Sequence, residues 1–121
     1  MKLTVENAVE IAKKYNFHFD EKWQEIVINS NIWIDDEDLG FLRIENGING
    51  NGLEFNCAYE FGITALKSGR FGYHTTASKN ITTTEEFEEN IKNFLFFIEL
   101  AKPLEKKYAE QVKMNKMDGD F

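Results

Sequence analysis

The sequence is poor in cysteine and proline, with one of each in 121 residues. A lone cysteine, Cys57, cannot form a disulfide within the chain or supply a cysteine-rich metal site. A lone proline is too few for a proline-rich linker, and 121 residues fit one domain of ordinary size. We therefore expect a single domain, residues 1–121, whose hydrophobic core forms without a disulfide, a metal or another cofactor.

Long apolar runs are also missing. The longest spans five residues, Phe94 to Ile98, far fewer than a membrane-spanning helix needs. The first residues lead directly into an amphipathic pattern and not into the apolar core of a signal peptide. These features lead us to expect a cytoplasmic protein with no membrane partner.

The sequence contains fewer basic than acidic residues. Lysine and arginine number 14 against 21 acidic residues, for a net charge of −7. Negative charge of this size repels phosphate backbones, which disfavours direct binding of nucleic acid and favours a basic protein surface as partner. The same charge also serves solubility, so both interpretations stay open.

The familiar catalytic motifs are absent from the sequence. It contains no G-x-x-x-x-G-K-[ST], G-x-S-x-G or H-E-x-x-H, and no G-x-G-x-x-G after a strand. Its two histidines are too few for a typical histidine-rich metal site. We therefore favour binding over catalysis. An enzyme without a recognisable motif is the alternative, and a pocket holding a carboxylate or histidine with a shifted pKa would reveal it.

The N-terminal half of the chain predicts a helix and then strands. Apolar residues at helical spacing predict a helix over residues 5–15, with Thr4 as its N-cap. Residues 23–34 predict one strand, or two short ones with a bend at residues 29–31, and residues 41–45 predict the next strand. Three Asn-Gly pairs in residues 46–52 predict a tight hairpin turn.

The next segment alternates apolar and polar residues over 53–61, which predicts a strand that Gly62 ends. Residues 67–69 predict a turn, and residues 70–77 another strand. Strands joined by short turns form an antiparallel sheet, and amphipathic helices cover one of its faces.

A long helix completes the fold. Thr83 and Glu86 fit a capping box, and an apolar stripe continues through Leu104 and Tyr108 to Val112, with a change of spacing at Leu104. Pro103 lies inside the stripe, so we expect a kink or a break near it. The fold class is therefore α+β, with an N-terminal helix, a three- to four-stranded antiparallel sheet and a long C-terminal helix. We expect residues 113–121 to form a flexible tail.

This long helix is apolar on two sides. Phe96 and Leu100 form an i, i+4 pair opposite the main stripe, so packing on one sheet face leaves them uncovered. One interpretation is that the N-terminal helix, or a segment folded back after Pro103, covers them. The other is a homodimer or partner interface.

Two acidic clusters are candidates for contact with a basic partner. The first resembles half of a calcium loop of the EF-hand type, but Leu39 stands where an oxygen ligand is needed and Asn46 stands where a glutamate is needed, which disfavours calcium. Acidic residues at the start of a helix also stabilise its dipole, which accounts for part of the second cluster. The residues concerned are Asp35, Asp36, Glu37, Asp38, Glu85, Glu86, Glu88 and Glu89.

Two further features have ordinary explanations. Residues 67–79 carry four basic or histidine residues and no acid, with Phe71 and Tyr73 between them. This pattern is typical of a strand that binds nucleic acid, but the aromatic residues also suit a core. Cys57 lies on the apolar face of its strand, where a thiol behaves as a small hydrophobic group.

The acidic clusters, together with the size of the chain, resemble those of small phage and mobile-element proteins, above all the anti-CRISPR proteins. Several anti-CRISPR proteins act as anionic mimics of DNA. The resemblance implies an inhibitor of a basic, nucleic-acid-handling protein such as a CRISPR effector nuclease. The chain is also similar to class I secretion chaperones in size, acidity and its opening order of elements. A secretion chaperone or toxin-immunity protein is therefore the alternative.

Overall fold

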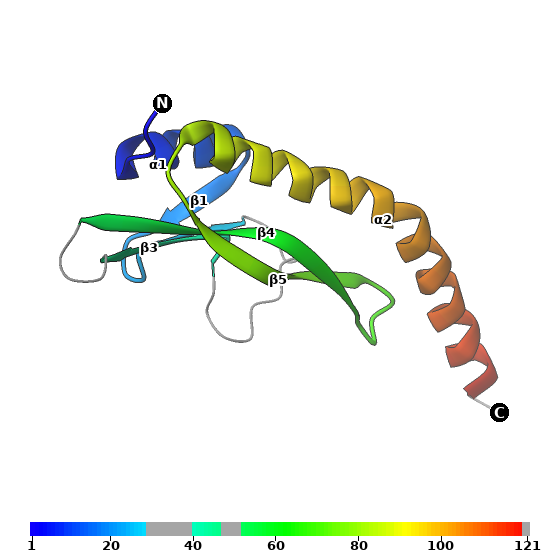
Figure 1. The fold of residues 1–121 in the computed structure, drawn as a ribbon. Coiled ribbons are helices and arrows are strands. Elements are labelled where there is room, and N and C mark those ends of the chain that lie inside the picture. The colour runs from blue at the N-terminus through cyan, green and yellow to red at the C-terminus, as the bar shows by residue number, and fades with distance from the viewer. Residues whose placement is uncertain (29–39, 47–51, 120–121) are drawn as a thin grey trace.

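A computed structural model describes residues 1–28, 40–46 and 52–119 of the chain. In these residues one helix comes first, five strands follow it, and a second helix comes last (Figure 1). The elements are α1 (Val5–Lys14), β1 (Phe17–Asp20), β2 (Glu25–Ile28), β3 (Leu42–Asn46), β4 (Leu53–Ala65), β5 (Phe71–Ile81) and α2 (Thr84–Gly119).

The sheet is an antiparallel meander. Its strands lie side by side in sequence order, β1 to β5, and each pairs antiparallel with the next. Figure 1 shows that both helices lie on the same face of the sheet. The α+β class is thus confirmed, whereas the expected three or four strands are five.

The additional strand is β1, which the sequence pattern did not predict. Asn16, the residue after the C-cap Tyr15 of α1, has a positive φ of 63°, and the chain turns there into the sheet. Phe17 then pairs with Ile28, and Phe19 with Ile26. The four residues Phe17 to Asp20 do alternate apolar and polar side chains, but four residues are the shortest run for which such alternation indicates a strand. The expected strand 23–34 corresponds to β2, and its residues 29–34 lie outside the described part of the chain.

β4 is longer than predicted because Gly62 does not end it. The strand continues to Ala65, and Gly62 pairs with His74 of β5. A Cβ atom at Gly62 would lie 2.8 Å from Nε2 of His74, so this glycine gives the histidine ring room across the ladder. A glycine inside a strand can thus mark a close approach rather than an end.

The turn between β4 and β5 falls where the sequence predicted it. Gly69 N–H donates to the Leu66 carbonyl, and Gly69 has φ of 91°. A side chain is strained in this left-handed region, and a Cβ atom there would lie 3.4 Å from Cα of Ala109. We expect Gly69→Ala to lower the free energy of unfolding by about 1 kcal/mol. Urea denaturation would measure it, and an unchanged midpoint would contradict the expectation.

Aromatic side chains dominate the core between α2 and the sheet. The Phe94 ring lies 5.7 Å from that of Phe41, 4.9 Å from Phe61 and 6.1 Å from Tyr73, measured between centroids. Phe94 is fully buried. This cluster fixes which side of α2 faces the sheet.

α2 runs without a break from Thr84 to Gly119, with Pro103 inside it. Its axis turns toward the β4–β5 hairpin along the second half (Figure 1), so the expected disruption is a bend and not a break. Tyr108 Oη donates to the Leu66 carbonyl at 2.6 Å, and Phe71 N–H donates to Glu105 at 2.7 Å. Residues 113–119, expected to lie in a tail, belong to this helix.

Candidate functional site

The two acidic clusters can be compared only in part. Residues 35–38 lie outside the described residues. The second cluster lies on the first two turns of α2, next to the N-terminus of the chain and α1.

The first two carboxylates of this cluster have partners within the fold. The N-terminal amine of Met1 donates to both carboxylate oxygens of Glu85, at 2.8 and 3.0 Å. Glu86 accepts from the backbone N–H of Thr83 at 3.2 Å, and Glu86 N–H donates to Oγ1 of Thr83. The predicted capping box is thus confirmed.

These contacts keep both carboxylates ionised. Hydrogen bonding from the N-terminal amine lowers the pKa of Glu85 below its usual range. Hydrogen bonds from Thr82 and Thr83 do the same for the pKa of Glu86. A lowered pKa means that the cap stabilises the fold at neutral pH and loses this effect as pH falls through the folded-state value.

The other two carboxylates differ from each other. Tyr15 Oη donates to Glu88 at 2.9 Å, and Lys14 Nζ lies 3.6 Å from the same carboxylate. Glu89 is exposed and makes no hydrogen bond or ion pair with the described residues. Three members of the cluster are therefore fixed by neighbours, and Glu89 is the one that remains available.

The pair Phe96 and Leu100 lies on the outer side of α2. Phe96 is 63% exposed and Leu100 is 61% exposed. The interpretation that α1 or a returning segment covers them is wrong. The chain at the end of α1 meets α2 about two to three turns earlier, where Tyr15 bonds to Glu88. The chain after Pro103 continues outward as helix.

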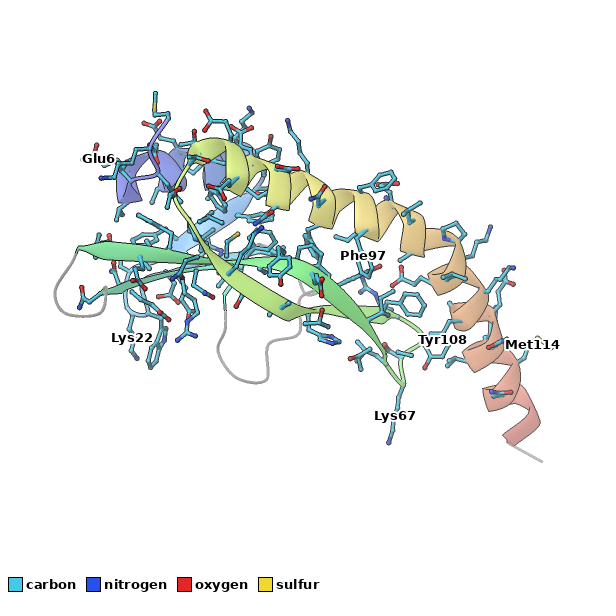
Figure 2. All side chains as sticks on the ribbon, viewed as in Figure 1. Glu6, Lys22, Lys67, Phe97, Tyr108 and Met114 are labelled. Atoms are coloured by element: carbon cyan, nitrogen blue, oxygen red, sulfur yellow. The ribbon has the colours of Figure 1, made fainter. Side chains whose placement is uncertain are left out.

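Leu104 joins this exposed surface, although the sequence pattern placed it in the core stripe. It is 58% exposed. The stripe changes its spacing at Pro103, and the rotation places Tyr108, not Leu104, against the sheet. Figure 2 shows Tyr108 on the side of α2 that faces the hairpin, with Met114 on the other side. We call Phe96, Leu100 and Leu104 the outer stripe.

A groove of about 420 Å³ runs beside the outer stripe. Phe96, Phe97 and Leu100 form its helical wall, while Tyr59 and Phe61 of β4 contribute to the opposite wall. A smaller polar hollow of about 230 Å³ adjoins it and shares Tyr59 and Asn93 with it. The groove therefore has room for an apolar side chain next to a polar rim.

The basic segment 67–79 has a structural role. Phe71 and Tyr73 are buried, which confirms the core interpretation of these aromatic residues. Lys79 Nζ lies 5.0 Å from the ring centroid of Tyr59. No row of exposed aromatic residues is available on this segment to stack on bases.

Cys57 is fully buried, and burial raises the pKa of its thiol to about 12. The side chain of Asn90, which is also buried, lowers the pKa of the Cys57 thiol, but this effect is smaller than the increase that burial causes.

Within the described residues no group of three possible metal ligands occurs. The described helices include none that is long and apolar enough to cross a membrane.

Comparison of the chain with protein-family models, with curated proteins and with solved structures gives no match.

Proposed function

We propose that this protein works by binding and is a small acidic inhibitor. Its partner is a basic protein that handles nucleic acid, such as a CRISPR effector nuclease. The observation that carries the proposal is the fixed acidic cluster at the start of α2. Hydrogen bonds to neighbours hold Glu85, Glu86 and Glu88 in place. Surface carboxylates that are already ordered lose less side-chain entropy on binding a cation.

The charge state of the cluster supports the same proposal. The pKa values of Glu85 and Glu86 are lowered, so both groups carry negative charge at neutral pH. The shift of Glu85 comes first from its hydrogen bond with the N-terminal amine, and the shift of Glu86 comes from the hydrogen bonds that cap α2, so neither shift needs a catalytic explanation. A basic surface that normally holds phosphates would meet ordered carboxylates in their place.

Glu89 is the residue through which this proposal is tested, because it has no partner within the described chain. We expect Glu89→Lys to reduce recovery of the partner at least tenfold in affinity purification from the host. Its matched control is Glu10→Lys, an equal charge change at an exposed position of α1. A partner recovered equally with both variants would contradict the role of the cluster.

A further inference from the structure

The outer stripe of α2 has the geometry of a surface that pairs with its own copy. Its members, Phe96, Leu100 and Leu104, follow one another at intervals of four. At about 100° per residue, Phe96 and Leu104 lie roughly 40° to either side of Leu100. All three are more than half exposed. The stripe is therefore its own counterpart under rotation about an axis through Leu100, as a two-fold interface requires.

The charges along α2 favour an antiparallel arrangement of the two copies. Residues 84–99 carry five carboxylates and one lysine, whereas residues 101–115 carry four lysines and two carboxylates. This division also suits the dipole of a single helix. Antiparallel pairing sets the acidic half of each helix against the basic half of the other, and parallel pairing would set like against like.

Shape agrees with a crossing at Leu100. α2 bends toward the hairpin, so its outer side is convex (Figure 1). Two convex helices touch near their midpoints, and Leu100 lies close to the middle of Thr84–Gly119. Beside it, the groove of about 420 Å³ has room for the leucine that comes from the other copy.

We propose that the protein forms an antiparallel homodimer in which the two copies of α2 cross at Leu100 and Phe96 of each copy packs against Leu104 of the other. Farther from the two-fold axis, Lys107 lies one turn after Leu104 and Glu89 lies two turns before Phe96. Lys107 of each copy is therefore within reach of Glu89 of the other copy. This dimer does not depend on the proposed inhibitory function, and it can form whether or not a basic partner exists.

The mass in solution tests the dimer first. We expect light scattering after gel filtration to give twice the chain mass of 14.1 kDa. Phe96→Glu places a charge in an apolar contact and should raise the dissociation constant by about 100-fold or more. Circular dichroism of this variant should be unchanged. A monomer at all concentrations, or a dimer unaffected by Phe96→Glu, would overturn the proposal.

Crosslinking with a short bismaleimide tests the direction of the pairing. Leu100→Cys lies on the two-fold axis and should link to its own copy. Gln111→Cys, an exposed position about 20° around the helix from Leu100, should not, because 11 residues on either side of the axis separate the two thiols by roughly 33 Å along the helices. The native Cys57 is buried and does not compete. Efficient linking through Gln111→Cys would show a parallel pair and overturn the antiparallel one.

A charge exchange separates this inference from the proposed function. Glu89→Lys and Lys107→Glu should each weaken the dimer up to about fivefold, and the two together should restore it. If Glu89 contacts a basic partner, the double variant regains the dimer but not the partner. A dimer weakened additively by the two changes would contradict the contact between these residues.

Discussion

Replacing Phe94 with alanine is expected to lower the free energy of unfolding by about 3–5 kcal/mol. Phe94 is fully buried and its ring meets those of Phe41, Phe61 and Tyr73. Truncation removes these contacts and leaves a cavity between α2 and the strands, which a helix anchored at both ends cannot close. Urea denaturation followed by far-UV circular dichroism would measure the loss.

Phe96→Ala is the matched control, since it makes the same chemical change two residues further along α2. Its ring is mostly exposed, so the expected loss is below about 1 kcal/mol. Both variants are compared at a protein concentration where the chain is monomeric, because Phe96 also belongs to the proposed dimer contact. Equal losses from the two variants would contradict the orientation of α2 on the sheet.

The contrast between these two phenylalanines was predictable from the sequence. Phe87, Ile91 and Phe94 recur at helical spacing, and this periodicity alone identifies the side of α2 that packs on the sheet. The capping box of Thr83 and Glu86 was predictable for the same reason, since it depends only on local spacing. Local rules therefore predicted where the two helices begin and which residues of α2 are buried before Pro103.

Other features depend on contacts between distant segments, which no local pattern contains. β1 has only four residues, and pairing with β2 makes it a strand. From the sequence, Gly62 was expected to end its strand. The ring of His74 on the neighbouring strand explains why a glycine is needed inside β4. Leu104 changes sides because Tyr108 contacts the hairpin.

The acidic cluster at the start of α2 shows the same limit for the candidate site. Its composition was visible in the sequence, but the partners of Glu85 and Glu88 come from Met1 and Tyr15, more than 70 residues away. Nothing in the spacing indicated that Glu89 would be the carboxylate left without a partner. The sequence thus located the cluster, and the fold decides which member can meet another molecule.

Cys57 is expected to react with iodoacetamide roughly 1,000-fold more slowly in the folded protein than in the unfolded chain at pH 8. The thiolate is the reactive form, and burial raises the pKa of this thiol from 9.0 to about 12. At pH 8 a shift of this size lowers the thiolate fraction about 1,000-fold. Mass spectrometry of timed samples, with and without urea, would measure the ratio.

The same shift makes stability depend on pH in the alkaline range. The unfolded thiol loses its proton near pH 9, while the folded thiol keeps it until about pH 12. The folded state therefore binds more protons in this window, and stability falls as pH rises through it. Cys57→Ala should remove this part of the pH dependence. Rapid labelling of the folded protein would show an accessible, activated thiol and would contradict the interpretation of Cys57 as a small hydrophobic core residue.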